Sequence, residues 1–381
     1  MTPKHTKHLT RRRVLQAAAA AGVATFGLPM LNLGSYRAFG ANAPKYSSRA
    51  MKLVERSLVI DMLSPLKLDF TPEAYSHPIS EETAAQFRTS GISAFHNAIG
   101  TGADETLPYI TAWQGYAGRN AHVFSLVGTA PDLDRAKKER KIAVIIGVQN
   151  SAHFRKVEDV KMFYQLGQRV SQLTYNNQNL IGSGSTDRAD GGISDYGEQV
   201  IKAMNEVGML VDVSHCGPQT TLDAIEISPK PIAFTHSNCR ALNDHPRLKT
   251  DEAIQKLAAK GGVMGITGVR NFVTAQEPTT IEDIVNHIDH VVKLVGIDHV
   301  GVGSDADLNG YDDMPRDQLD GMIKRLSPSY KFRGKLDVEG FDHPRKIFDL
   351  TEALIRRGYS DANIVAILGG NFRRLLGGTW L

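Results

Sequence analysis

Three short apolar runs, each ending in a side chain that can bind a metal ion, constrain the fold of this chain most. They occupy residues 211–215, 232–236 and 300–305 and end in His215, His236 and Asp305. Runs of this length and composition predict buried β-strands. In a closed (β/α)₈ barrel the C-terminal ends of the strands form the floor of the active site. Two imidazoles and a carboxylate there would suit a divalent ion such as Zn²⁺.

Strand-like and helix-like segments alternate along the rest of the chain. The strand-like runs are residues 58–63, 92–99, 142–149, 170–175, 210–215, 231–236, 262–267 and 299–305. Amphipathic segments predict helices at residues 132–141, 159–167, 196–208, 218–227, 251–260 and 281–296. Eight such units within one domain favour the α/β class and a single (β/α)₈ TIM-type barrel over an open sheet.

Two segments interrupt this alternation and predict additions to the barrel. Residues 123–128 form an extra strand-like run, which we place outside the eight strands. Residues 309–339 are rich in Gly, Pro and charge and follow the last strand. They predict a long loop or short helices over the barrel mouth, where loops shape substrate sites.

The formal net charge of +3 comes from the N-terminal segment. Six of the 44 Lys and Arg residues lie within the first 43 positions, which hold no Asp or Glu, so 38 basic and 41 acidic residues remain. The remainder is weakly acidic, and no basic run with interleaved aromatic residues occurs in it. These features give no support to nucleic-acid binding.

The first 43 residues have the form of an export signal, which leaves residues 44–381 for the barrel domain. Residues 10–16 read Thr-Arg-Arg-Arg-Val-Leu-Gln, a weakly hydrophobic stretch follows, and Ala41 and Ala43 supply the small residues of a cleavage site. An uncleaved anchor is the alternative, but Gly22, Gly27 and Pro29 would make a poor spanning helix. We expect export by the twin-arginine machinery, cleavage near Ala43 and a periplasmic location.

The chain has two cysteines, Cys216 and Cys239, and each lies close in sequence to one of the two histidines. In an oxidising periplasm they could form a disulfide, since adjacent strand ends lie close together. Two buried residues behind the site are the alternative, and a role as further metal ligands is conceivable. The sequence does not decide between these interpretations.

Several motifs from the fifth strand onward resemble one family. They are Val-Asp-Val-Ser-His at 211–215, Phe-Thr-His-Ser-Asn at 234–238, Asp-His-Pro-Arg at 244–247, Val-Gly-Val-Gly-Ser-Asp at 300–305 and Leu-Gly-Gly-Asn-Phe at 368–372. Their order and spacing are similar to those of the membrane (renal-type) dipeptidases, binuclear-zinc metallopeptidases of the amidohydrolase superfamily. The resemblance extends from about Leu58 to the C-terminus.

This resemblance implies a role for each matching residue. His215 and His236 would bind the more buried zinc ion, and Asp305 would bind the other and manage the proton of the attacking water. Arg247 would hold the terminal carboxylate of the substrate, which suits the fork of a guanidinium group. His96, at the end of the second strand, faces the same rim and is a further candidate for substrate binding.

The first half of the chain departs from the family pattern. Where the family has Asp-Gly-His-x-Asp after the first strand, this chain has Leu63 and Pro65 at the ligand positions, and neither can bind a metal. The bridging Glu of the family is Gln149 here, a neutral and weak ligand through its carbonyl oxygen. Tyr175 replaces the His that contacts the tetrahedral intermediate.

These losses predict at most one metal ion per chain, most plausibly zinc. Its ligands would be His215 and His236, with Gln149 or Asp305 and water; alternatively, Gln149 forms hydrogen bonds in the pocket. One Zn²⁺ with three protein ligands and an open position still lowers the pKa of bound water to about 7. Asp305 could serve as the general base and Tyr175 as the donor to the oxyanion.

The first hypothesis is therefore an exported, dipeptidase-like metal-dependent hydrolase that acts on a small amide or dipeptide with a free carboxylate. The loss of the second set of ligands motivates two alternatives. One is a non-hydrolytic periplasmic tailoring enzyme, which performs an isomerisation or proton transfer on a peptide-derived metabolite. The other is a catalytically silent binding protein. The family resemblance also implies that a homodimer can form.

Overall fold

The computed structural model describes residues 45–68, 72–99 and 102–380, and the predicted export signal lies outside these residues. From Ser48 onward the chain forms one compact unit. Its strands are β1 (Ile60–Asp61), β2 (Ala94–Ile99), β3 (Phe124–Leu126), β4 (Ile142–Val148), β5 (Val170–Gln172), β6 (Leu210–Asp212), β7 (Ala233–Ser237), β8 (Val263–Ile266) and β9 (Val300–Val302).

Eight of these strands close into a parallel barrel, which confirms the predicted fold. The order β2-β1-β9-β8-β7-β6-β5-β4 is closed by pairing of β2 with β4, from Ala94 opposite Ala143 to Ile99 opposite Val148. β3 pairs with the first half of β4, from Phe124 opposite Ile142 to Leu126 opposite Val144. It therefore lies outside the ring of eight, as predicted.

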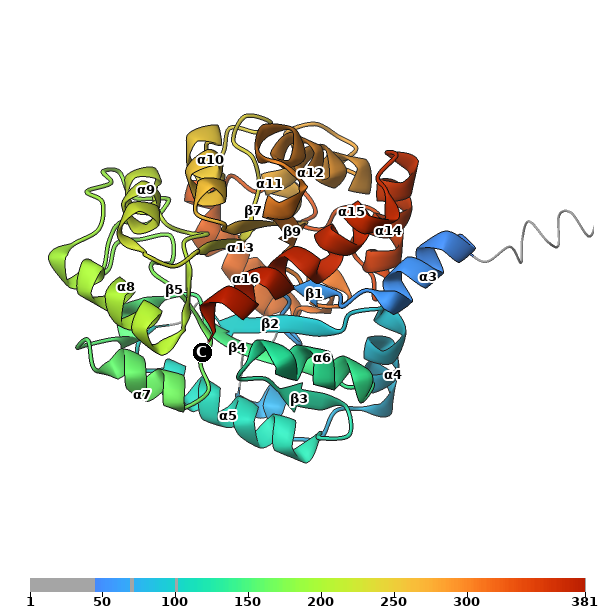
Figure 1. Ribbon diagram of the computed structural model, residues 1–381, viewed down its shortest axis with the longest axis horizontal. Helices are drawn as coiled ribbons and strands as arrows, with labels where there is room; N and C mark the ends of the chain where they lie inside the picture. The colour runs from blue at the N-terminus through green and yellow to red at the C-terminus, as the bar shows by residue number, and fades with distance from the viewer. Residues whose placement is uncertain (1–44, 69–71, 100–101, 381) are drawn as a thin grey trace, which may run out of the picture. The chain divides into compact units, whose positions relative to one another are not determined.

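Helices surround the ring of strands (Figure 1). They are α3 (Ser48–Arg56), α4 (Glu81–Ser90), α5 (Thr106–Arg119), α6 (Ala130–Lys138), α7 (Asp159–Gln165), α8 (Asp195–Val207), α9 (Pro218–Ile227), α10 (Asp251–Ala259), α11 (Arg270–Val273), α12 (Ile281–Val295), α13 (Arg316–Tyr330), α14 (Lys346–Arg356), α15 (Asp361–Val365) and α16 (Asn371–Thr379). Local signals set several boundaries. Ser194 caps the start of α8, and Gly208 ends it with a φ of 82°, which favours glycine.

α16 closes the N-terminal end of the barrel. It packs against the first residues of the strands in one buried apolar cluster, which includes Phe372, Leu375 and Leu376 of the helix and Ala94, Ala143, Ala233 and Val263 of the strands. In Figure 1 this red helix runs across the ring of strands. Because apolar contacts fill this end, a polar site is left to the C-terminal ends of the strands.

The segment at residues 309–339 is more regular than the sequence predicted. Instead of a loop or short helices only, it contains α13, a helix of 15 residues with Pro328 near its end. Leu319 of this helix joins a small apolar cluster with Leu68, Met314 and Leu336. Such tertiary packing stabilises a helix that Gly321 and Pro328 weaken, and composition alone does not reveal it.

Candidate metal and active site

His215 and His236 lie side by side at the C-terminal ends of β6 and β7. Both imidazoles are buried, their ring centroids are 5.0 Å apart, and their Nε2 atoms are separated by 2.9 Å. Asp212 joins the two strand ends, because its carboxylate accepts hydrogen bonds from the Ser214 amide at 2.9 Å and the Thr235 hydroxyl at 2.6 Å. The structure thus brings together the two histidines that the sequence singled out.

The hydrogen bonds at the Nδ1 atoms assign the tautomers of both rings. Oδ1 of Asn176 accepts from Nδ1 of His215 at 2.7 Å, and the Tyr330 hydroxyl also donates to this oxygen. Thr235 gives its hydroxyl proton to Asp212 and therefore accepts from Nδ1 of His236 at 2.8 Å. With Nδ1 protonated, the Nε2 atom of each neutral ring carries a lone pair.

Both imidazoles are held in the neutral form. Burial lowers the pKa of His215 and of His236 well below the ordinary value, and the positive charge of Arg247 lowers both further. Two lone pairs that face each other at 2.9 Å repel unless a cation lies between them or nearby. Fixed Nδ1 partners of this kind are typical of metal-binding histidines. The two residues therefore fit one ion that prefers imidazole, such as Zn²⁺.

The other two predicted ligands are not gathered around the same point. Among the residues that the structure describes, no three His, Cys, Asp or Glu side chains lie close enough together to hold an ion. Gln149 and Asp305 instead line a cavity, together with Leu63 and Pro65. The neutral Gln149 and the two apolar side chains offer no anionic ligand, so these residues do not fit a second ion.

This cavity has a volume of about 370 Å³ and opens at the C-terminal ends of the strands. Its wall comes from the loops after β1, β2, β4, β5 and β9 and from α13; it comprises Leu63, Pro65, Leu68, Ala98, Gly102, Glu105, Gln149, Tyr175, Asp305, Tyr311, Met314, Met322 and Arg325. A smaller cavity of about 40 Å³ shares Tyr175 and Asp305 with it and reaches His215. The large cavity therefore lies next to the histidine pair.

Asp305 is held at the base of the cavity in an unusual backbone conformation. Its φ is 59°, its amide donates to the Leu63 carbonyl at 2.8 Å, and its own carbonyl accepts from the Tyr311 hydroxyl at 2.8 Å. Burial raises the pKa of its carboxyl to about 7; Arg247 opposes this shift, while Asp61 and Asp212 add to it. A carboxyl with such a pKa can both accept and release a proton near neutral pH.

Tyr175 forms the wall between the cavity and the histidines. Its ring stacks on that of His215, with centroids 4.3 Å apart and planes inclined by 21°. Burial raises the pKa of its phenol, and the nearby carboxylate of Asp305 raises it further. The hydroxyl therefore keeps its proton and can donate a hydrogen bond to a developing oxyanion.

Arg247 lies behind the histidines and does not line either of these two cavities. Its side chain is almost completely buried, and its terminal nitrogens donate to the carbonyls of Ser214 and, at 3.5 Å, His236. Its guanidinium also lies over the ring of Phe272. In this structure Arg247 supports the ends of β6 and β7, and its predicted contact with a substrate carboxylate stays a prediction.

His96 also lies away from the cavity wall, contrary to the expectation that it lines the pocket. It is 1% exposed, and its Nδ1 atom is 2.7 Å from the Met62 carbonyl. A Cβ atom at Gly147 would stand 1.8 Å from its Nε2 atom, so the imidazole fills the space that this glycine leaves inside the barrel. The sequence placed His96 on the correct strand but could not reveal this inward packing.

The sequence reasoning missed other residues of the site. Asn176 follows Tyr175 directly and has a φ of 63°, a conformation that Asn adopts more readily than most residues. Tyr330 and Arg325 come from α13, and Glu105 immediately precedes α5. Only Asn176 had a signal, its position beside a candidate residue; the others lie outside every motif that the sequence displays.

The two cysteines are free in the structure, and both are buried. Cys216 accepts a hydrogen bond from the Thr174 hydroxyl at 3.2 Å, and Cys239 faces the His287 carbonyl at 3.7 Å. Burial raises the pKa of Cys216 to about 11. Of the open interpretations, the structure matches that of two buried thiols behind the site.

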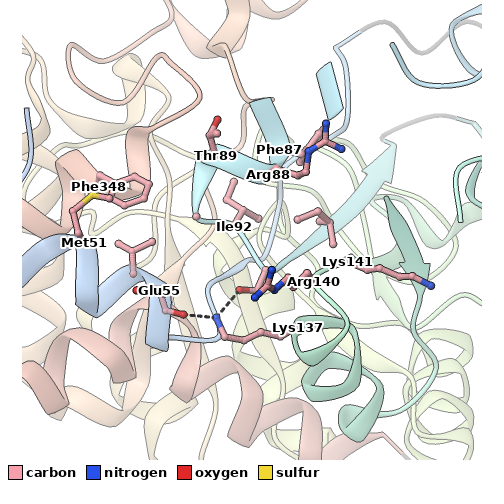
Figure 2. Close-up of a pocket in the computed structure, with 14 residues that line it drawn as sticks. Met51, Glu55, Phe87, Arg88, Thr89, Ile92, Lys137, Arg140, Lys141 and Phe348 are labelled. Atoms are coloured by element: carbon pink, nitrogen blue, oxygen red, sulfur yellow. Dashed lines mark hydrogen bonds between the residues drawn. The ribbon is translucent and has the colours of Figure 1, made fainter. Parts of the chain in front are cut away.

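A larger cavity of about 530 Å³ lies at the opposite end of the strands (Figure 2). It is formed by the segments before β2 and β4, α3 and Phe348, with Lys137, Arg140 and Lys141 on one side. Lys137 is engaged within the protein, because its ammonium donates to the Glu55 carbonyl at 2.9 Å. This cavity is far from the barrel edge that carries the histidines, so we do not assign it to the active site.

Comparison with known proteins identifies relatives of the chain. Residues 76–321 match the family described as membrane dipeptidase (peptidase family M19). Dipeptidase verJ of Clonostachys rogersoniana is 32% identical over 254 residues, which cover 66% of this chain and 59% of that protein. Dipeptidase tcpJ of Claviceps purpurea is 30% identical over 252 residues, with 65% and 53% covered. The chain thus spans little more than half the length of these relatives.

A solved structure of an amidohydrolase from Pseudomonas aeruginosa is similar over nearly the whole barrel. It is 29% identical, with a TM-score of 0.78, and the match covers 87% of this chain and 99% of that one. Among the described residues, no helix is both long and apolar enough to cross a membrane.

Proposed function

This chain belongs to the membrane dipeptidase family, and on that basis we propose that it is a metal-dependent hydrolase of small amides, dipeptides in particular. The observation that carries this proposal is the pair of neutral imidazoles whose Nε2 lone pairs face each other at 2.9 Å, next to a small cavity that Asp305 and Tyr175 also line. Burying two such lone pairs without a cation costs free energy, whereas with a cation both nitrogens act as its ligands.

We propose one zinc ion, held by His215 and His236 and completed by water, with Asp305 or Gln149 within the same rim. When bound, zinc supplies a Lewis acid that polarises a carbonyl group and acidifies water. The set does not favour a second ion, because Leu63 and Pro65 are apolar and Gln149 is neutral. A single ion would distinguish this chain from the two-zinc pattern of the family.

The side chains around the cavity would divide the proton transfers of amide hydrolysis. Asp305, whose carboxyl pKa is about 7, would take a proton from the attacking water and pass it to the leaving amine. The protonated phenol of Tyr175 would donate to the oxygen that becomes negative in the tetrahedral intermediate. The apolar side chains of Leu63, Met314 and Met322 would exclude bulk water from the same space.

One observation favours a second candidate, a non-hydrolytic proton transfer on a peptide-derived metabolite. The side of the cavity formed by Leu63, Pro65 and Gln149 lacks the anionic ligands of a two-ion hydrolase. Asp305 and the Tyr175 phenol could still move a proton between two atoms of a bound molecule. Recovery of an isomerised rather than cleaved product would favour this candidate.

We further propose that the chain is exported by the twin-arginine machinery, cleaved near Ala43 and active in the periplasm. The twin-arginine motif and the small residues at Ala41 and Ala43 support this proposal. N-terminal sequencing of the protein recovered from a periplasmic fraction tests it.

Turnover of a broad panel of L,L- and L,D-dipeptides tests the hydrolytic function. We expect release of free amino acids, its loss on treatment with a chelator and its recovery on adding zinc. His299→Ala is a suitable control, because this imidazole contacts the Gly262 carbonyl at 2.8 Å near the start of β9, away from the cavity. A zinc-containing protein that cleaves no member of the panel would contradict the proposal.

A further inference from the structure

The cavity at the N-terminal ends of the strands, about 530 Å³ in volume, combines an apolar wall with a group of basic side chains (Figure 2). The apolar wall comes from α3, α4, the segment before β2 and α14; it comprises Met51, Val54, Phe87, Ile92 and Phe348. The charged residues of the lining are Arg88, Lys137, Arg140 and Lys141, opposed by Glu55. Cavities of this size that combine apolar walls with a few polar groups are typical of small-molecule sites.

Arg140 has a backbone conformation that favours glycine, with a φ of 57°. Its amide donates to the Lys137 carbonyl at 3.0 Å, and the following amide, that of Lys141, donates to the Ala136 carbonyl at 2.9 Å. These two hydrogen bonds end α6 in a motif whose left-handed residue is usually glycine. An arginine in this conformation lowers the stability of the fold, and such residues persist most often where the side chain has a function.

The Arg140 guanidinium differs from its basic neighbours in having no partner. Arg88 pairs with Glu81, and Lys141 pairs with Glu139 at 3.5 Å. Within the described part of the chain, no hydrogen bond or ion pair holds the Arg140 guanidinium, although it lines the cavity. Its donors are therefore available to a bound molecule.

Lys137 adds a second positive charge at the same edge of the cavity. Its ammonium donates to the carbonyls of Glu55, at 2.9 Å, and Ser57, and to the Ser93 hydroxyl at 3.4 Å. These acceptors are neutral, and none of the described carboxylates forms an ion pair with the ammonium. Burial lowers the pKa of Lys137, and the charge of Glu55 opposes this shift. A bound anion would compensate the partly buried charge.

We propose that this cavity binds an amphipathic carboxylate. Its apolar body would pack against Met51 and Phe348, and its carboxylate would accept two parallel hydrogen bonds from Arg140, with Lys137 close by. The carboxylate of Glu55 in the same lining repels a second anionic group, so the ligand carries one negative charge. The site is independent of the proposed hydrolytic function, because it lies at the end of the strands opposite the histidine pair.

Matched small molecules separate the two parts of this recognition. Octanoate has both the hydrocarbon chain and the carboxylate, whereas 1-octanol lacks the charge, acetate lacks the chain and octylammonium reverses the charge. By isothermal titration calorimetry on the full chain, we expect one octanoate per chain and affinities at least about 10-fold lower for the other three, since each loses a charged hydrogen bond or buried apolar surface. Equal affinities for octanoate and 1-octanol would overturn the inference.

Two variants of Arg140 separate binding from folding. Arg140→Gly relieves the left-handed conformation, so it should leave the melting temperature unchanged or raise it, yet weaken octanoate binding about 10-fold. Arg140→Gln should weaken binding by a similar factor. Lys138→Gln is the control, because it removes a neighbouring charge of α6 that does not line the cavity. Unchanged octanoate affinity in both Arg140 variants would overturn the inference.

Methionine methyl signals in NMR spectra locate the bound molecule. Met51 lines this cavity, whereas Met322 lines the cavity that contains Asp305. Met51→Leu and Met322→Leu assign the two signals. Octanoate should shift the Met51 signal and leave that of Met322 in place. A shift of the Met322 signal alone would place the ligand near the histidines and overturn the inference, as would a parent chain that binds no octanoate.

Discussion

The two halves of the barrel rim differ in how completely their polar groups are organised. At the ends of β6 and β7, His215 and His236 face each other and every Nδ1 atom has a hydrogen-bond partner. We call this the inner half. In the outer half, at the ends of β1 and β4, the positions where the family pattern has its second set of metal ligands carry Leu63, Pro65 and Gln149, which line a cavity. Our proposal of one ion rests on this difference, because the inner half has a supported pair of donors and the outer half keeps only the Asp305 carboxylate.

Removal of an inner imidazole should have the largest effect. In His215→Ala the chain should lose its metal and its hydrolytic turnover, because one remaining imidazole cannot hold the ion alone. His290→Ala is the matched control, since His290 lies on α12 and contacts Asp251 at 2.7 Å outside the barrel. Retention of both metal and turnover in His215→Ala would contradict the claim that the histidine pair of the inner half binds the ion.

Loss of the partner that orients His215 should have the next largest effect. Asn176→Gly keeps the positive φ of 63° but removes the oxygen that accepts from Nδ1. We expect metal affinity to fall about 10- to 100-fold, the usual cost of losing such a partner. Asn176→Asp retains an acceptor and should lose much less. Titration with a fluorescent zinc chelator measures both affinities, and equal values for the two variants would contradict this role.

The carboxyl of Asp305 should make the stability of the metal-free chain depend on pH. Its pKa is raised from 3.8 to about 7 in the folded chain. Between these values the folded state binds the proton more tightly than the unfolded state, so this group's stabilising contribution is lost as pH rises through 7. The slope is at most about 1.4 kcal/mol per pH unit.

Urea unfolding at several pH values measures that dependence. The two buried histidines contribute in the opposite sense, since their lowered pKa values cost stability as pH falls below 6.5. The quantity of interest is therefore the difference between the parent chain and Asp305→Asn from pH 5 to pH 7. A difference that does not change with pH would show that the Asp305 carboxyl titrates in its ordinary range.

Restoring one charge to the outer half should have the smallest effect. Gln149→Glu places a carboxylate on the cavity wall, where it should strengthen binding of the one ion modestly. The stoichiometry should stay at one, because Leu63 and Pro65 still provide no ligands. Gln199→Glu, on the exposed side of α8, is a suitable control. Gln168→Glu is not, because Gln168 is buried against His153. A second equivalent of zinc in Gln149→Glu would show that one added carboxylate is enough for the outer half to bind an ion of its own.

The sequence revealed the barrel and the histidine pair because both depend on local patterns. Short apolar runs that end in a polar side chain identify strand ends, and the closed sheet brings these ends to one rim. His215 and His236 are only 21 positions apart in the chain and lie on adjacent strands. The extra strand β3 was recognisable in the same way, as a run outside the eightfold alternation.

The remaining parts of the site depend on contacts that no local pattern encodes. Tyr330 reaches Asn176 across 154 positions, from a helix that the composition of its segment did not predict. The inward packing of His96 depends on the absence of a side chain at Gly147 on the neighbouring strand. Arg247 sits in the expected loop, but only the structure shows that its two terminal nitrogens donate to the backbone carbonyls of Ser214 and His236.

Elemental analysis of the purified chain tests the one-ion account most directly. The facing lone pairs of His215 and His236, and the apolar side chains at Leu63 and Pro65, predict one equivalent of zinc per chain. Two equivalents would contradict the account, because the outer half would then hold an ion without the ligands expected for it, and a value of zero after growth with added zinc would contradict it equally.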